Sequence, residues 1–259
     1  MLLLLSSSSF LLPLLFFLLL GLCIGSFLNV LIDRLPNGKS IGGRSHCDHC
    51  KHALGIGDLI PVFSYIFLQG KCRYCKKKIA KQNIIIELLT GVAFMLTWVF
   101  FPDLYSSPIQ LLGYFLLTSS SIVIVGADFK YHIIPDSATV FFILASFLVE
   151  TGYSIATPLF GGVGLFLILY LIYALTRGKM MGFGDVKLAF GIGVLFGLYN
   201  GLLALYLSFV TGGIVSMCLL LSGKSKLKSK IAFGPFLITG TFIMLYFGDN
   251  INQLIQKIF

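Results

Sequence analysis

Residues 180–191 read MMGFGDVKLAFG and set one carboxylate, that of Asp185, directly before a long apolar run. The rest of the chain has the same character, because 57% of its 259 residues are hydrophobic and only 11% are charged. Its mean hydropathy is +0.96, whereas a soluble domain has about 25% charged residues. The composition therefore predicts a polytopic membrane protein, in which an acid at this position needs a specific partner or function.

Apolar stretches that can form transmembrane helices recur along the chain, each bounded by glycine, proline or charge. There are eight, at roughly residues 11–32, 84–101, 109–127, 137–153, 157–176, 185–200, 201–222 and 234–248. Tyr199, Asn200 and Gly201 form the only break between the sixth and the seventh. The first stretch lacks a basic n-region and an early cleavage site, so we interpret it as a retained transmembrane helix. The fold class predicted is an all-α polytopic membrane protein with about eight transmembrane helices.

Residues 33–82 differ from the rest, since they hold most of the charge and two pairs of cysteines. We predict that they form a small polar insert between the first two transmembrane helices. The expected organisation is a first transmembrane helix in residues 1–32, a cysteine-rich insert in residues 33–82 and a seven-helix transmembrane domain in residues 83–259.

The positive charges predict the topology, because lysine and arginine accumulate in the cytoplasmic loops of membrane proteins. If the insert is cytoplasmic, alternation of the helices puts eighteen of the nineteen lysines and arginines on that side, and only Lys257 outside. We therefore expect a multi-pass protein with its N-terminus outside. The net charge of +9 is then a signal of orientation, with some attraction to anionic lipids. No nucleic-acid-binding motif accompanies it.

The insert contains two C-x2-C pairs that are separated by 21 residues, Cys47 with Cys50 and Cys72 with Cys75. This spacing is typical of sites where four thiolates surround Zn²⁺ tetrahedrally, and such a closed site leaves no position for a catalytic water. So short a segment has little core of its own, so that a metal would supply much of its folding free energy. Two disulfides are the alternative, which a cytoplasmic location disfavours. The neighbouring histidines are expected to be solvated and not ligands: His46, His49 and His52.

Only ten acidic residues are present, and most of them, including Asp58, fall in the polar insert or in short external segments. Asp136 follows the sequence IIP and suits a helix cap. Glu87, Asp128 and Asp185 remain. Asp128 ends the third predicted transmembrane helix and Asp185 begins the sixth, so we expect both at the cytoplasmic face. Acids at such places usually face a cavity or one another.

If Asp128 and Asp185 approach each other, the pair holds one proton, because neighbouring carboxylates resist double ionisation. The ionised member can take a proton from water while the other protonates a scissile carbonyl, as in aspartic proteases. We therefore predict that Asp128 and Asp185 form a catalytic pair that hydrolyses a peptide bond. A structural role for both, as helix caps or interfacial charges, stays open at this stage.

The residues around the pair have predicted supporting roles. Gly182 and Gly184 are expected to adopt positive φ and to let the backbone approach a substrate strand, or alternatively to pack helices closely. Lys187 cannot share the helix face of Asp185 and is expected to anchor at the interface or to reach another group. Glu87 is expected to be buried, either near the site as a positioning group or in a plain contact between helices.

An intramembrane pair of acids also occurs in proton-coupled transporters, which is the non-enzymatic alternative. The acids lie at one face and not at the midplane where transporter sites are built, and no inverted repeat is evident. The sequence lacks an H-E-x-x-H motif, a P-loop and a Rossmann fingerprint. These observations favour an aspartic hydrolase.

Several motifs occur in a fixed order: GSFLNVLIDRLP (25–36), GKCRYCKKKIA (70–80), IELLTG (86–91), DFKYHIIPD (128–136), GFGDVKL (182–188) and FGPFL (233–237). In this order they resemble the type IV prepilin peptidase family, over nearly the whole chain. The resemblance implies that Asp128 and Asp185 are the catalytic aspartates and that Gly182 and Gly184 belong to a G-x-G-D motif. It also implies four zinc-binding cysteines: Cys47, Cys50, Cys72 and Cys75.

Members of this family cut the basic leader from prepilins and pseudopilins at the cytoplasmic side, directly after a glycine. They commonly N-methylate the new N-terminus with S-adenosylmethionine. The resemblance thus implies a bacterial inner-membrane aspartic endopeptidase and N-methyltransferase that acts in type IV pilus assembly, protein secretion or competence, with residues 83–259 as the peptidase domain. A presenilin-like intramembrane protease, which shares G-x-G-D, and a structural metal-binding membrane protein are the remaining alternatives.

Overall fold

The computed structural model describes residues 8–101, 107–150, 155–179, 181–223 and 231–258. Within these ranges every regular element is a helix, apart from two isolated β-bridges in the insert. The predicted all-α class is therefore confirmed. The chain divides into two compact units, Met1–Pro108 and Ile109–Phe259. The division falls after α3, so the second predicted transmembrane helix belongs to the first unit.

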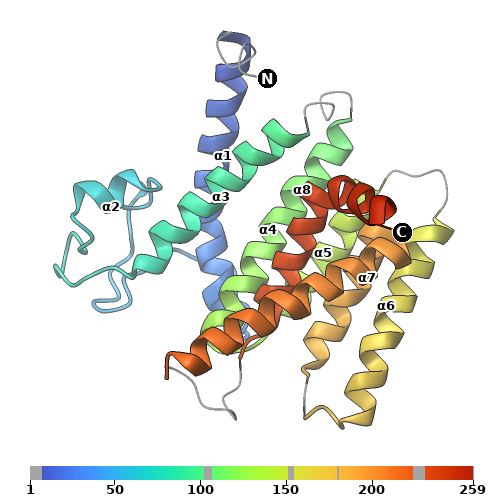
Figure 1. Cartoon of the computed structure of the whole chain (residues 1–259). Coiled ribbons are helices and arrows are strands. Elements are labelled where there is room, and N and C mark those ends of the chain that lie inside the picture. The colour runs from blue at the N-terminus through green and yellow to red at the C-terminus, as the bar shows by residue number, and fades with distance from the viewer. Residues whose placement is uncertain (1–7, 102–106, 151–154, 180, 224–230, 259) are drawn as a thin grey trace. The chain divides into compact units, whose positions relative to one another are not determined.

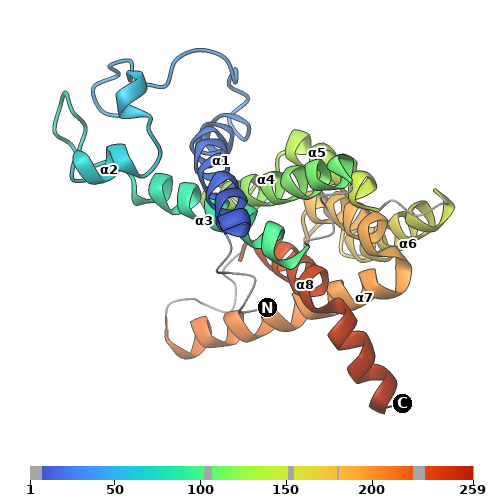
Figure 2. The ribbon, with the colours of Figure 1, turned by 90° about the horizontal axis from the view of Figure 1, so that it is seen from above.

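The first unit is built on two long helices, α1 (Ser8–Arg34) and α3 (Lys81–Phe100), which pack against each other (Figures 1 and 2). Glycines let the two backbones touch: a Cβ on Gly21 would lie 2.7 Å from the carbonyl oxygen of Thr90. A Cβ on Gly25, one turn later, would lie 2.7 Å from the Cα of Glu87. Small residues four apart are a common means of close packing in membranes. They bring Glu87 directly against α1.

The insert between these helices has little regular structure. It contains one short 3-10 helix, Ile56–Asp58, and a five-residue helix, α2 (Phe63–Phe67). Isolated bridges pair His46 with Ala53 and Lys71 with Lys78. Cys72 is the only buried hydrophobic residue in the insert, which the structure describes in full. Its fold therefore needs something other than a hydrophobic core.

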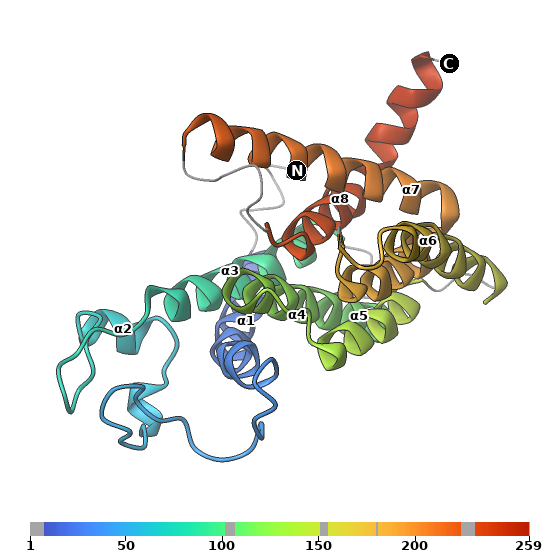
Figure 3. The same ribbon diagram turned by 90° about the horizontal axis from the view of Figure 1, so that it is seen from below.

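The second unit contains five helices: α4 (Pro108–Tyr131), α5 (Asp136–Val149), α6 (Ala156–Leu175), α7 (Phe183–Leu221) and α8 (Gly234–Ile258). Helix α7 packs against α5, α6 and α8 (Figures 1 and 3). Glycines again allow close contact, because a Cβ on Gly161 of α6 would overlap the backbone of Gly193 of α7. This packing holds α6 and α7 together at closely spaced backbones.

Helix α7 has 39 residues, which corresponds to about 58 Å and is almost twice the thickness of a bilayer core. It is interrupted at Gly197, where φ is 71° and ψ is −174°, a backbone conformation suited to glycine. Figure 1 shows the two halves of α7 running in different directions. The predicted break between the sixth and seventh apolar stretches therefore exists, but at Gly197, and Tyr199 to Gly201 are helical.

Five helices of the described part are long and apolar enough to cross a membrane: Leu11–Arg34 of α1, and α3, α4, α6 and α7. Helix α5 is apolar but has only 14 residues. Large apolar side chains stay exposed along α6, as expected for contact with lipid: Phe160, Val163, Leu167 and Leu171. The structure is that of a multi-pass membrane protein. The predicted cytoplasmic lysines of residues 224–230 and the end of the predicted stretch 137–153 lie outside the described residues.

Candidate active site

Asp128 and Asp185 come together within the second unit. Asp128 lies in the last turn of α4 and Asp185 in the first turn of α7. Both are buried, with exposed fractions of 6% and 7%. The two carboxylates are close enough to interact electrostatically. The structure thus brings the two predicted acids to one place.

The carboxylate of Asp128 is held by the start of α8. The backbone N–H of Gly234 donates to Oδ2 of Asp128 over 2.9 Å. This position requires glycine, since a Cβ there would lie 2.7 Å from the same oxygen. Pro235 follows, and proline suits the first turn of a helix because it has no N–H to satisfy. The contact gives a physical reason for the Gly-Pro pair within FGPFL.

The carboxylate of Asp185 is held by its own helix start. The N–H of Gly182 donates to Oδ2 of Asp185 over 3.2 Å. The other oxygen, Oδ1, is buried and has no hydrogen-bond partner among the described residues. A buried oxygen without a partner is costly, so it marks a place for a donor such as water.

Neither of the two glycines before Asp185 has an unusual backbone conformation. Gly182 has a φ of −76°, and Gly184 is helical, so the predicted positive φ angles are wrong. The turn is a regular helix start, which needs no left-handed residue. At Gly184 a Cβ would lie 2.9 Å from the Cβ of Ile134. Close packing, the predicted alternative role, is therefore what the structure supports for Gly184.

The N-termini of two helices face the pair of carboxylates, although Asp128 itself lies in the last turn of α4, at the negative end of that helix's dipole. Asp185 lies in the first turn of α7, and Asp128 accepts from the first residue of α8. Helix N-termini carry about half a positive charge and stabilise nearby anions. The two helix N-termini thus partly offset the cost of burying a charge on this pair of acids.

The four cysteines of the insert form a second cluster, in the first unit. Their Sγ atoms all lie within 4.8 Å of one another, and Cys47 and Cys75 are 3.9 Å apart. Four sulfurs around a tetrahedral Zn²⁺ lie about 3.8 Å apart, so the arrangement fits the metal. None of the cysteines in the described residues forms a disulfide. The cluster could therefore hold a metal ion, and the histidines nearby are not part of it.

Two similar turns carry these sulfurs. The N–H of Cys47 donates to the carbonyl of His52 over 3.0 Å, and that of Cys72 to the carbonyl of Lys77 over 2.8 Å. The backbone N–H of Cys50 also lowers the pKa of the Cys47 thiol to about 7, whereas desolvation and the neighbouring thiols raise the pKa of Cys50 to about 11. A lowered pKa favours the thiolate, which is the form that binds metals.

Family comparisons cover both units. The family profile described as "Bacterial Peptidase A24 N-terminal domain" matches residues 19–101, and that of the "Type IV leader peptidase family" matches residues 115–217. A protein of Stutzerimonas stutzeri named "Prepilin leader peptidase/N-methyltransferase" is 30% identical over 267 residues, which span 91% of each chain. The chain belongs to the type IV leader peptidase family.

Further relatives carry the same name. The protein of Pseudomonas aeruginosa is 30% identical over 268 residues, which span 91% of this chain and 90% of its own length. That of Bacillus subtilis (strain 168) is 29% identical over 241 residues, which span 92% and 95%. No solved structure matches the chain at a significant level. The two matched segments fall one in each compact unit.

Two other predicted residues, Lys187 and Glu87, make contacts of their own. Lys187 forms an ion pair with Asp136 of α5, with 2.5 Å between Nζ and Oδ1. Asp136 is thus an ion-pair partner, and Pro135 is the cap residue of α5. Glu87 belongs to the first unit, where its Oε2 accepts the N–H of Val62 over 2.8 Å. That contact joins the insert to α3.

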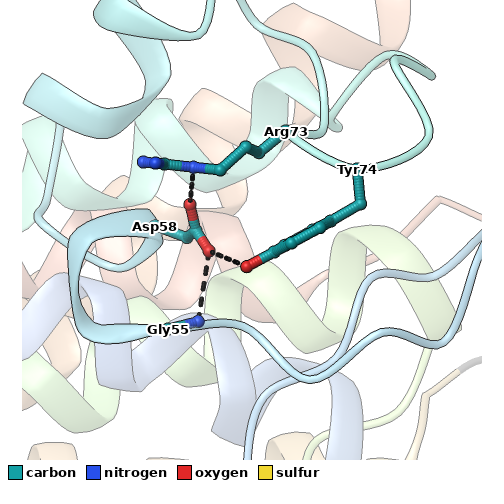
Figure 4. Close-up of polar contacts among 4 residues, drawn as sticks. All are labelled: Gly55, Asp58, Arg73 and Tyr74. Atoms are coloured by element: carbon teal, nitrogen blue, oxygen red, sulfur yellow. Dashed lines mark hydrogen bonds and ion pairs between the residues drawn. The ribbon is translucent and has the colours of Figure 1, made fainter.

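Asp58 was predicted to be an ordinary acid of the polar insert, but it is buried and has several partners. Figure 4 shows its carboxylate between three partners: Arg73 Nε at 2.7 Å, the N–H of Gly55 at 3.1 Å and the hydroxyl of Tyr74 at 3.4 Å. Only 6% of its side chain is exposed. Arg73 and Tyr74 lie between two of the clustered cysteines, so Asp58 ties the second C-x2-C turn to the middle of the insert. The residues next to Asp58 in the sequence do not predict these contacts, because Arg73 and Tyr74 are distant along the chain.

Proposed function

We propose that this protein is an aspartic endopeptidase of the bacterial inner membrane that removes the basic leader of prepilins or pseudopilins after a glycine. The observation that carries the proposal is the buried pair of Asp128 and Asp185, each held by one backbone N–H. Membership of the type IV leader peptidase family supports prepilins as the substrate class. The cut falls at the cytoplasmic face.

The pair supplies the acid and the base of the hydrolysis. With one proton on the pair, the ionised carboxylate takes a proton from water, and the water oxygen bonds to the scissile carbonyl carbon. The protonated carboxyl donates to the carbonyl oxygen. The C–N bond then breaks, and the leaving nitrogen receives a proton from the pair. Oδ1 of Asp185, which has no other partner in the described residues, is the atom best placed to receive the water.

The other predicted site residues support this pair. Gly184 lets Ile134 close over the first turn of α7, and Gly182 supplies the N–H that orients Asp185. Lys187 adds an exposed ion pair between α7 and α5 through Asp136. These contacts hold the carboxylate in one orientation, as catalysis by a positioned acid requires.

The topology follows from the charges. We propose eight spans, with α7 contributing one on each side of Gly197 and with α5 and α8 included. The N-terminus is then outside, and residues 33–82 and both aspartates are at the cytoplasmic face. Residues 1–32, 33–82 and 83–259 act as anchor, insert and peptidase domain. Membrane lipids surround the helices, and nucleic acid has no part.

The cysteine cluster is proposed to bind a structural Zn²⁺. Cys47, Cys50, Cys72 and Cys75 fill all four positions of a tetrahedral site, so the metal would fold the insert without taking part in hydrolysis.

A second activity is proposed from the relatives, whose names include N-methyltransferase. S-adenosylmethionine would supply the methyl group from its sulfonium sulfur to the new α-amino nitrogen of the cleaved pilin. The chain's own task is to bind this donor next to an amine that has lost its proton. Pilus assembly, secretion and competence all use substrates of this class.

Cleavage of a defined substrate tests the peptidase proposal. Purified protein in liposomes is incubated with a prepilin-like peptide that carries a basic leader, a glycine and an apolar helix, and the products are identified by intact mass. We expect cleavage after glycine by wild type, and none by Asp128→Asn or Asp185→Asn. Asp249→Asn, at an exposed position of α8, is the matched control. Ion-gradient-driven uptake without cleavage would support a transporter instead, and cleavage within the apolar helix would support a presenilin-like protease.

A further inference from the structure

Large apolar side chains are exposed in the middle of the polar insert. They gather in residues 56–67, at Ile56, Leu59, Ile60, Phe63, Ile66 and Phe67. The last three are spaced i, i+3 and i+4 along α2 and therefore share one face of that helix. A contiguous exposed apolar surface marks a place of contact with something else. The hydrolytic mechanism and the cysteine cluster give this surface no role.

The start of α2 is tied to α3 at the depth where α3 presents side chains suited to lipid. Val62, the cap residue of α2, donates its N–H to Oε2 of Glu87 over 2.8 Å. Glu87 lies six residues after Lys81, where α3 begins, which corresponds to about 9 Å along the helix axis. Exposed apolar side chains of α3 precede and follow it: Ile85, Leu88, Leu89 and Val92. Because α3 is apolar enough to cross a membrane, α2 starts at the level of the bilayer surface.

Both ends of α2 are held by local contacts. Val62 has a φ of 63°, a rare conformation for a β-branched residue, which persists only where its surroundings hold it. At the other end the N–H of Gly70 donates to the carbonyl of Tyr65 over 2.8 Å, and that of Lys71 to Leu68 over 3.0 Å. The helix is therefore fixed between α3 and the segment that follows it.

That following segment is strongly basic. Residues 71–81 contain no acid, and their lysines are all exposed: Lys71, Lys76, Lys77, Lys78 and Lys81. An isolated bridge sets Lys71 opposite Lys78. Like charges directly opposite each other on paired strands are destabilising, so the two lysines favour an anion beside them. Apolar and cationic groups thus adjoin each other next to the start of α3.

We propose that residues 56–81 are a docking surface for anionic phospholipid, in which the apolar face of α2 enters the headgroup region and Lys71 and Lys78 bind lipid phosphates. Segments that combine an apolar face with lysines lie in the membrane interface, with the apolar face about 5–10 Å deep. Long lysine side chains reach from such a position to the phosphates.

Two features favour lipid over a protein partner. The insert is joined at each end to a helix that can cross a membrane, so it stays near the bilayer. Its lysines also complement the anionic lipids that collect in the cytoplasmic leaflet. The second cysteine pair, which lies between Lys71 and Lys78, is then held at the membrane surface. This role goes beyond leader cleavage and does not depend on it.

Tryptophan fluorescence of the full-length protein in liposomes tests the depth of α2. Trp98→Phe removes the only native tryptophan, and Phe67→Trp adds one at a residue that is 82% exposed. We expect lipids brominated near the headgroup to quench this tryptophan when the liposomes contain anionic lipid. Ile41→Trp in the same background is the matched control, because Ile41 is an exposed apolar residue of the insert outside residues 56–81. Its emission should not be quenched.

Lysine variants in the Phe67→Trp background test the recognition of anions. Each lysine near an anionic surface changes membrane affinity by about fivefold. Lys71→Gln with Lys78→Gln should therefore lower the ratio of docked to undocked insert by about 25-fold. The same two positions changed to arginine should keep the wild-type ratio. Lys39→Gln with Lys51→Gln removes the same charge from the first half of the insert and should change the ratio by less than about twofold.

Absence of quenching at Phe67→Trp in anionic liposomes, with the metal content of the insert intact, would overturn the proposal. Equal quenching in neutral and anionic liposomes, or quenching that survives removal of Lys71 and Lys78, would also overturn it. A change in emission that follows the protein-to-lipid ratio without quenching would assign the surface to a second copy of the chain instead. These readouts need no substrate, so a failure of the peptidase proposal leaves them unaffected.

Discussion

The insert, residues 33–82, buries a single hydrophobic side chain, that of Cys72, whereas the first turns of α7 bury Val186, Leu188, Ala189 and Ile192. The insert is held by polar contacts and four clustered sulfurs. The helices of the second unit are held by close packing at glycines. The two regions should therefore respond to different perturbations, which separates the stability of the metal site from that of the aspartate pair.

Removal of the metal should have the largest effect, and only on the insert. Structural Zn²⁺ contributes roughly 10–16 kcal/mol to the folding of small domains, and the insert has no core to replace it. After chelation, limited proteolysis should cut within residues 33–82 while fragments of residues 109–259 stay intact. Protection of the insert in metal-free protein, with metal content checked by elemental analysis, would contradict this account.

Gly234→Ala should damage the aspartate pair and leave the insert unchanged. The new Cβ would lie 2.7 Å from Oδ2 of Asp128, so the carboxylate must move. Misplacement of a reacting group by about 1 Å costs on the order of 100-fold in rate. Leader cleavage measured by intact mass checks this expectation.

Gly213→Ala is the control for this substitution, because no atom lies within 4 Å of the Cβ that it adds in α7. It should cleave like wild type. Equal rates for Gly234→Ala and wild type would show that the α8 contact does not position Asp128.

Asp58→Asn should loosen the insert by a smaller amount. The change weakens the ion pair with Arg73 and disturbs the contacts to Gly55 and Tyr74. A buried hydrogen bond to a charged group is worth about 1.5–3 kcal/mol. Chelator titration should therefore release the metal more readily from Asp58→Asn than from Asp48→Asn, which changes an acid inside the first cysteine pair. Identical release curves would show that the metal alone organises the insert.

Lys187→Ala should have the smallest effect. Its partner Asp136 has 75% of its side chain exposed, and surface ion pairs contribute about 0–1 kcal/mol. Thermal unfolding of the helical region should shift only slightly, and the shift should shrink further at high salt. A loss of several kcal/mol would mean that this pair, and not packing at glycines, fixes α5 to α7.

The sequence allowed prediction of the helices and of the residues that form both clusters. Hydropathy located the apolar stretches, and spacing located the cysteines, because both depend on the local chain. The break in α7 was misplaced because Gly197 is one of several glycines in an apolar run, and nothing local says which one leaves the helical conformation.

The partners of the acids could not be predicted in the same way. Gly234 reaches Asp128 across 106 residues of sequence, and Glu87 reaches the backbone of Val62. Such contacts follow from tertiary packing, for which a residue pattern alone gives no distance.

Asp128 and Asp185 are proposed to act as one unit, and the cleavage rates of the two single variants and of the double variant test this proposal. Groups that act together are not additive. We predict that Asp128→Asn and Asp185→Asn each lose at least about 1,000-fold, and that the double variant loses no more than either one. A folded single variant that cleaves within about tenfold of wild type, or a double variant whose loss is the product of the two, would contradict the account.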